Sequence, residues 1–119
     1  MRLLISAIAM FLLATLPGTS KADDGVTIGE MAEHCQKPDG DFFKMYCYTY
    51  VAAVIDVQTI YSLADATGPQ RVCFPPPVVA RQASAVFVQW AAHHPASHHR
   101  PAAAGIVESM TNAFPCSDR

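Results

Sequence analysis

The pattern of apolar and polar residues divides the chain into an apolar leader followed by four helical segments. The leader begins with Arg2, continues through an apolar run at 3–16, and is broken by Pro17-Gly18; Ser20 and Ala22 then provide the small residues of a cleavage site. The run is shorter than the ~20 residues that span a bilayer. We therefore expect residues 1–22 to be a cleaved signal peptide, with an uncleaved anchor as the alternative, and a mature exported domain at 23–119.

The mature part shows helical periodicity and little two-residue alternation, which predicts an all-α fold, a compact bundle of about four helices. Thr27 and Glu30 have the spacing of a capping box, which predicts a short first helix that ends near Cys35. Asp41 is the expected N-cap of a long second helix that ends near Ala66, before Gly68-Pro69.

The second helix carries an apolar stripe with alternating spacings of four and three, which we expect to face inward. Further apolar residues cover most of its remaining surface, so the helix is either central to the bundle or shared with a second subunit. We expect Asp56 to be a buried, hydrogen-bonded structural residue. Lys44, Gln58, Ser62 and Asp65 look solvated. The stripe consists of Phe43, Cys47, Tyr50, Val54, Val57, Tyr61 and Ala64.

Prolines delimit the last two helices. Pro77 fits the first turn of a third helix that ends before Pro95, and Pro101 fits the first position of a fourth. The residues expected to face inward are Val79, Ala83, Val86, Trp90 and His93 in the third helix, and Ile106, Met110 and Ala113 in the fourth.

Four cysteines, all in the mature part, predict two disulfides in an exported protein. Cys35 lies at the end of the first helix and Cys47 near the start of the second, and a short turn makes these helices antiparallel neighbours. Cys73 precedes the third helix and Cys116 follows the fourth. Among the three possible pairings, this layout favours Cys35–Cys47 and Cys73–Cys116, which would stabilise the fold by roughly 3 and 4 kcal/mol.

Composition narrows the range of functions. With 119 residues, 51% of them hydrophobic and 15% charged, the chain is a single folded domain rather than a disordered segment. Loss of Arg2 and Lys21 with the leader would leave six basic against ten acidic side chains, a net charge of −4. The basic residues are scattered, which argues against a nucleic-acid partner and against membrane association after signal cleavage.

Candidate chemistry is sparse, and we expect neither enzymatic activity nor a cofactor. No nucleophile elbow surrounds a serine, and no glycine-rich phosphate loop occurs. A histidine cluster suggests a metal carrier as a weak alternative, because Pro95 interrupts any helix that would fix the ligand geometry. We therefore expect no metal site. The cluster comprises His93, His94, His98 and His99.

Two blocks of sequence resemble the Rap/Tai family of type VI secretion immunity proteins. The first is similar to the family's C-x-G-Y-I-x-G-V-x-D and matches at Cys47, Tyr50, Val54 and Asp56, but has Thr49 and Ala53 where the family has glycine. The second follows the family's order of Cys73, a proline-rich turn, Gln82, Trp90, His94-Pro95, His99 and a final Ala113-Phe114-Pro115-Cys116. The family's arginine before the second histidine is His98 here, and its glycine before Val78 is Pro77.

This resemblance implies a small, non-catalytic periplasmic protein, often a homodimer, that binds and occludes the active site of a secreted peptidoglycan amidase effector. The candidate contact segments are a loop at 65–71, which is preferred, and a turn at 98–100. A small periplasmic stress chaperone, or another non-catalytic binding protein, is the alternative; it would use Tyr50, Val54 and Tyr61 as apolar surface. The candidate effector-binding residues are Asp65, Thr67, Gln70, Arg71, His98, His99 and Arg100.

Overall fold

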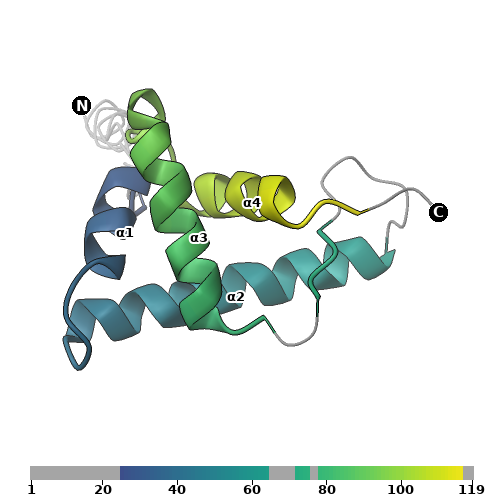
Figure 1. Cartoon of the computed structure of the whole chain (residues 1–119), viewed down its shortest axis with the longest axis horizontal. Helices are drawn as coiled ribbons and strands as arrows, with labels where there is room; N and C mark the ends of the chain where they lie inside the picture. The colour runs from purple at the N-terminus through teal and green to yellow at the C-terminus, as the bar shows by residue number, and fades with distance from the viewer. Residues whose placement is uncertain (1–24, 65–71, 76–77, 117–119) are drawn as a thin grey trace, which may run out of the picture.

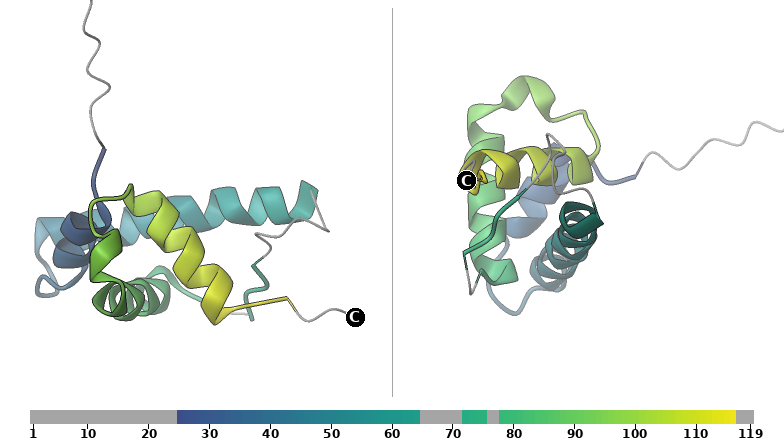
Figure 2. Two further views of the ribbon diagram at one scale, coloured as in Figure 1. Left: turned by 90° about the horizontal axis from the view of Figure 1, so that it is seen from above. Right: turned by 90° about the vertical axis from the view of Figure 1, so that its right-hand side faces the viewer.

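Four α-helices form the described part of the chain, which in the computed structural model comprises residues 25–64, 72–75 and 78–116. In chain order they are α1 (Ile28–Cys35), α2 (Phe42–Ala64), α3 (Ala80–His93) and α4 (Ala102–Ala113), with a one-turn 3₁₀ helix, η1 (Pro95–Ser97), before α4. Figure 1 shows α3 crossing the long helix α2 steeply, with α1 beside α3. Figure 2 shows α4 crossing the direction of α2 obliquely. The all-α prediction is confirmed.

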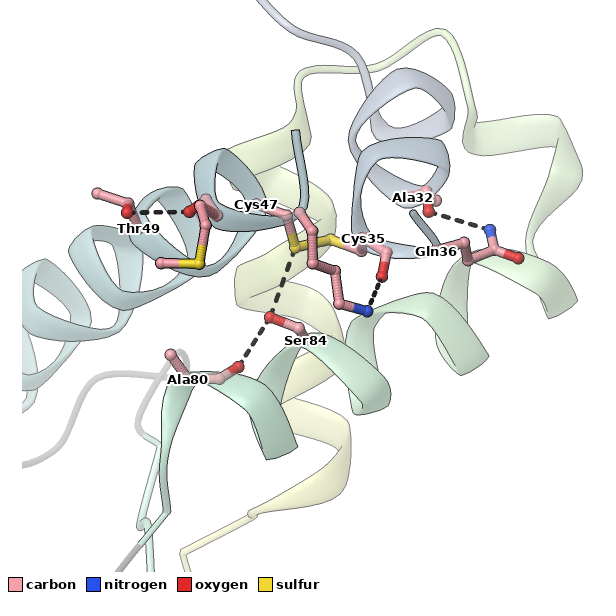
Figure 3. The surroundings of a disulfide bond; sticks show 9 residues. Ala32, Cys35, Gln36, Cys47, Thr49, Ala80 and Ser84 are labelled. Atoms are coloured by element: carbon pink, nitrogen blue, oxygen red, sulfur yellow. Dashed lines mark hydrogen bonds between the residues drawn. A yellow bond between two sulfur atoms is a disulfide. The ribbon is translucent and has the colours of Figure 1, made fainter. Parts of the chain in front are cut away.

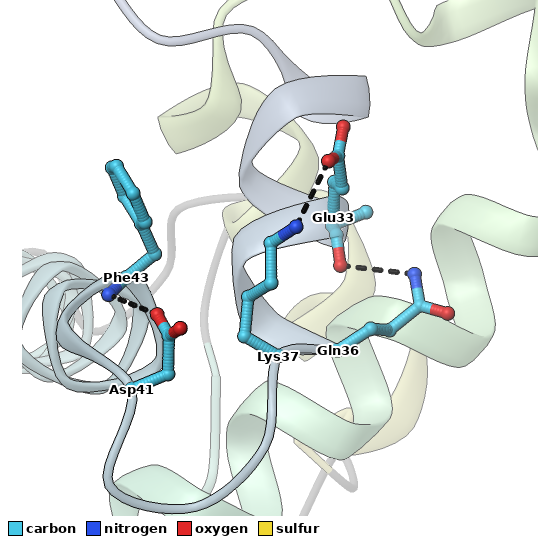
Figure 4. Close-up of polar contacts among 6 residues, drawn as sticks. Glu33, Gln36, Lys37, Asp41 and Phe43 are labelled. Carbon is cyan, nitrogen blue, oxygen red and sulfur yellow. Dashed lines mark hydrogen bonds and ion pairs between the residues drawn. The ribbon is translucent and has the colours of Figure 1, made fainter.

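The starts of α1 and α2 confirm the predicted capping residues. The Thr27 hydroxyl accepts a hydrogen bond from the Glu30 amide at 3.3 Å, and the Glu30 carboxylate accepts one from the Thr27 amide at 2.9 Å. These two bonds form the complete capping box. At α2, Asp41 Oδ1 accepts a hydrogen bond from the Phe43 amide at 2.7 Å (Figure 4). Gly40, with φ of +90°, allows the tight turn between the helices.

Two helix starts differ from the prediction. Helix α3 begins at Ala80 rather than near Pro77, because Val79 is extended and serves as its N-cap, which lets the half-buried Val78 pack on the core. Pro101 is the N-cap of α4 and not its first helical residue, since it pairs with Thr27 in an isolated β-bridge. The predicted positions at Pro77 and at the end of the second helix, Ala66, lie outside the described residues.

All four helices contribute to one core. As predicted, Ala83 in α3 and both Ile106 and Met110 in α4 are buried. Val86 and Trp90 are half-buried, whereas Val79, His93 and Ala113 are exposed, contrary to prediction, because they lie at helix ends beyond the packed centre. The largest fully buried side chains are Ile28 and Met31 from α1, Val51 from α2, Phe87 from α3, and Ile106 and Met110 from α4.

The predicted inward stripe of α2 is wrong in most of its positions. Cys47 is buried, and Tyr50 and Val54 are half-buried, but Phe43, Val57, Tyr61 and Ala64 are exposed. The inward face is centred on Cys47, Val51 and Gln58 instead. Gln58, expected to be solvated, is only 8% exposed, and Ser62 is half-buried. Because α2 is apolar around most of its circumference, periodicity alone could not identify the face that packs.

Asp56 is also placed differently from the prediction. Its side chain is exposed rather than buried. The cause is the rotation of α2 just described: with Val51 and Gln58 directed to the core, the 100° step per residue carries position 56 to the opposite side of the helix.

Candidate functional site

Two disulfides hold the scaffold together, in the predicted pairing. Cys35–Cys47 joins the end of α1 to the first half of α2, with Cα atoms 5.2 Å apart, and is buried. Cys73–Cys116 joins the segment before α3 to the chain after α4, with Cα atoms 5.0 Å apart. Next to this second disulfide, the Cys73 amide donates to the Phe114 carbonyl at 3.0 Å. The two ends of the α3–α4 pair are therefore fixed to each other.

Backbone hydrogen bonds fix the 98–100 turn to the start of α1. The Ile28 amide donates to the Arg100 carbonyl at 2.9 Å, and the Gly29 amide donates to the His98 carbonyl at 3.1 Å. These amides belong to the first turn of α1, where no carbonyl of the same helix can accept from them. A third bond runs from the Ala102 amide to the Val26 carbonyl at 2.9 Å. The turn is consequently pre-organised.

The three candidate side chains of this turn differ in their availability. His98 is half-buried, with Nε2 2.9 Å from the Ala91 carbonyl oxygen. Arg100 forms a two-pronged ion pair with Glu108. Hydrogen bonding from Arg100 and its positive charge hold the pKa of Glu108 below the ordinary value of 4.5. His99 is exposed, so it is the side chain of the three that lies open to a partner.

The other histidines of the cluster complete the end of α3. Nδ1 of His93 lies 2.8 Å from the Gln89 carbonyl oxygen, and Nδ1 of His94 lies 2.7 Å from that of Trp90. The His94 ring also stacks on Trp90 with centroids 4.3 Å apart. Within the described residues, no group of three or more His, Cys, Asp or Glu side chains is placed to hold a metal ion. Three histidines of the cluster therefore have structural roles, because their rings contact carbonyl groups near the end of α3.

The preferred contact segment is the predicted 65–71 loop. Asp65, Thr67, Gln70 and Arg71 lie outside the described residues. The chain that follows them is well anchored: Val72 is buried and pairs with Pro115 in an isolated β-bridge. The structure thus brings His98, His99 and Arg100 together in one turn and leaves the loop residues as a sequence-based prediction.

The inward-stripe interpretation missed an exposed apolar face of α2. Seven of its residues follow a strict alternation of three and four, the spacing of a helix-pairing seam. Ile60 is 66% exposed and Val57 52% exposed. The three-four spacing is visible in the sequence. Because α2 carries two such apolar stripes, the spacing alone does not show which one faces outward. We call this the outer face of α2: Phe43, Tyr46, Tyr50, Ala53, Val57, Ile60 and Ala64.

Despite the length of α2, none of the helices described here is both long and apolar enough to cross a membrane. In a comparison with protein families, the family described as Rap1a immunity proteins matches residues 27–116. This range runs from the capping threonine of α1 to the last cysteine, so it contains all four helices and both disulfides. No curated protein and no solved structure matches the chain.

Proposed function

The chain belongs to the Rap1a immunity protein family, and from this premise we propose that it protects the periplasm by occluding the active site of a type VI secretion peptidoglycan amidase. Family membership itself indicates an immunity protein that binds a secreted effector. The amidase, the occlusion mechanism and the periplasmic location are our extension of it. Occlusion requires no chemistry from the immunity protein, only a surface that fits the cleft.

The observation that best supports occlusion is the pre-organised end of the molecule around the 98–100 turn. Amides of α1 and the Arg100–Glu108 ion pair fix this turn, while His99 stays exposed. A segment held in one conformation loses little conformational entropy when it enters a cleft, so more of the contact energy appears as affinity. The two disulfides add covalent links from α1 to α2 and between the chain segments that flank the α3–α4 pair.

We propose the 65–71 loop as the principal contact and the 98–100 turn as the second. The loop follows the long helix α2 and precedes the anchored Val72 and Cys73. It carries Gln70 and Arg71, which offer an amide and a guanidinium to a partner. The net charge of −4 expected for the mature protein would favour approach to a basic cleft.

Affinity capture from periplasm tests the proposal. With the exported, disulfide-bonded protein as bait, we expect to recover a peptidoglycan amidase from cells that encode or receive the effector. A double variant, Gln70→Ala with Arg71→Glu, should weaken capture without lowering the melting temperature. Capture that is unchanged in this variant would exclude the loop, and a His99→Ala variant would then test the turn.

We further propose that the outer face of α2 is covered by a second copy of the chain. Its three-four spacing is that of two helices that pack side by side along a common seam. Ala53 lies in the middle of this seam, and its small side chain permits close approach of a partner helix. A homodimer would remove from water the most exposed apolar positions of the seam, Val57 and Ile60.

The same apolar surface is what a stress chaperone would use, so this alternative also has an observation in its favour. Of the three residues that sequence suggested for client binding, Tyr61 is 68% exposed, while Tyr50 and Val54 are half-buried. Suppressed aggregation of unrelated unfolded proteins at low pH, combined with failure to capture any amidase, would favour the chaperone over the immunity protein.

A further inference from the structure

A groove lined by both apolar and polar side chains lies between the end of α1, the first half of α2 and one face of α3. Its volume is about 600 Å³, within the ~300–1,000 Å³ that is usual for ligand sites. It is separate from the 98–100 turn and from the outer face of α2. We call it the cationic groove, after the charges described below; besides Ser84 at its base, its polar lining residues are Gln36, Asp39, Lys44, Tyr48, Arg81 and Gln89.

The base of the cationic groove is rigid. The buried Cys35–Cys47 disulfide lies beneath it, and Ser84 Oγ is 3.5 Å from Cys47 Sγ (Figure 3). The Ser84 hydroxyl in turn donates to the Ala80 carbonyl of its own helix at 2.7 Å. The disulfide thus joins α1 to α2 where the groove forms, and α3 packs against it through Ser84. A ligand would find the site already shaped, which reduces the ordering cost of binding.

The unpaired positive charge of the described chain is concentrated in this groove. Four basic side chains, Lys37, Lys44, Arg81 and Arg100, lie in the described residues. Lys37 is paired with Glu33 at 3.2 Å (Figure 4), and Arg100 is paired with Glu108. In the part that the structure describes, the other two, Lys44 and Arg81, form no ion pair, and both line the groove. With Asp39 included, the groove carries a net charge of +1 in an acidic protein.

The N–H donors of Lys44 and Arg81 lie in the groove, and some of them have no hydrogen-bond partner within the described part of the protein that would compete with a ligand. Lys44 Nζ donates to the Cys35 carbonyl at 2.6 Å and lies 5.3 Å from the centroid of the Tyr48 ring. An ammonium has three N–H donors, so this fixed side chain keeps donors for a ligand. Arg81 is exposed and offers a planar fork that matches a carboxylate with two parallel hydrogen bonds.

From this arrangement we infer that the cationic groove binds an acidic peptide segment of a protein partner, with a carboxylate between Lys44 and Arg81. The amide of Gln89, and Gln36 Oε1, would hydrogen-bond the peptide backbone, since Gln36 already donates its Nε2 to the Ala32 carbonyl at 3.0 Å. The volume accommodates several side chains, so a peptide fits better than a lone inorganic anion. This inference does not require that the partner be an amidase.

Titration of the disulfide-bonded, ¹⁵N-labelled protein with a short acidic peptide tests the inference. The probe is acetyl-Gly-Glu-Gly-Glu-Gly-amide, and the control peptide has glutamine at both glutamate positions. We expect saturable chemical-shift changes at Ser84, Val88 and Gln89, which weaken with added salt. Arg81→Gln should weaken binding by about tenfold, because a charge-assisted pair is lost. Lys37→Gln, which removes one positive charge elsewhere, should leave binding unchanged.

Three outcomes would overturn the inference. Equal shifts with the glutamine peptide would show that the carboxylate is not recognised. Binding unaffected by Arg81→Gln would place the peptide elsewhere. Displacement of the peptide by an equal concentration of inorganic phosphate would show a general anion site. The folded state of Arg81→Gln can be checked in the same spectra, since Arg81 is exposed and its loss leaves the core intact.

Discussion

At the residue scale, single contacts decide how closely the helices approach. Gly105 in α4 is buried against α1 and α3, and a Cβ built at this position would lie 2.7 Å from both Cγ1 and Cδ1 of Ile28 and 3.2 Å from Trp90 Cζ3. Ile28 is fully buried, so its side chain can shift only at the expense of other core contacts. Sequence alone identifies the glycine but not this neighbour, because the contact joins residues far apart in the chain.

We therefore predict that Gly105→Ala destabilises the protein. Overpacking costs about 1–3 kcal/mol, and the middle of that range outweighs the ~1 kcal/mol that alanine gains over glycine inside a helix. The expected net loss in the free energy of unfolding is about 1 kcal/mol, measured by denaturant titration. Gly25→Ala is the control, since nothing lies within 4 Å of its Cβ position. Equal stability of the two variants would mean that α4 is not held against Ile28.

The Arg100–Glu108 ion pair makes a pH-dependent contribution. Because the folded state lowers the pKa of Glu108, the pair stabilises the protein above the ordinary pKa of 4.5, and this stabilisation is lost as the pH falls through the lowered value. Glu108→Gln should reduce the melting temperature by a few degrees at most near neutral pH, since both side chains are over one-third exposed.

The difference from the unmodified protein should disappear at a pH below the folded pKa of Glu108. Asp56→Asn is the control for net charge, because this carboxylate is exposed. A melting-temperature difference for Glu108→Gln that persists unchanged into strong acid would show that the ion pair is not its cause.

At the element scale, sequence predicted the caps of the first two helices and both disulfides, but it misplaced the starts of α3 and α4 and the inward face of α2. The capping box of α1 and the cap at Asp41 depend on local spacing, which a sequence shows directly. The faces of α2 depend on which neighbours cover it. Gln58 is buried and Tyr61 is exposed, the reverse of what their polarity suggests. A helix that is apolar around most of its circumference does not by itself reveal which side faces the monomer's core.

The proposed helix pairing predicts the effect of a charge on the outer face of α2. Val57→Glu should convert a dimer into a monomer, because a buried carboxylate without a partner is costly to desolvate. Sedimentation equilibrium measures the mass, and circular dichroism checks that helicity is retained. Thr59→Glu adds the same charge at an exposed position outside the seam and should leave the dimer intact. A monomeric unmodified protein would refute the dimer proposal.

At the scale of the whole molecule, two disulfides of unequal accessibility join the helices into one scaffold. Cys35 and Cys47 are 4% and 0% exposed, whereas Cys73 is exposed and Cys116 half-buried. The pairing could be predicted from the sequence because the order of the helices brings together the helix ends that carry the paired cysteines. The orientation of the candidate contact turn could not be predicted in this way, since it depends on the hydrogen bonds from α1 to His98 and Arg100.

This difference in burial predicts the order of reduction. A thiol must reach a sulfur atom in order to attack it, so mild reductant should open Cys73–Cys116 before Cys35–Cys47. Alkylation followed by peptide mass mapping should show label first at Cys73 and Cys116. The same treatment in denaturant should label all four cysteines together. Earlier labelling of Cys35 and Cys47 in the native protein would contradict the packing described here.

The central claim, occlusion of an effector's active site, is tested most directly by titrating the captured amidase with this protein while following hydrolysis of a small, soluble peptidoglycan fragment. A fragment reaches any open active site, so its hydrolysis reports access to the catalytic groups themselves. The account predicts that hydrolysis falls to background at an equimolar ratio. Continued hydrolysis of the fragment by a fully formed complex would show that the active site remains open, and would contradict the account.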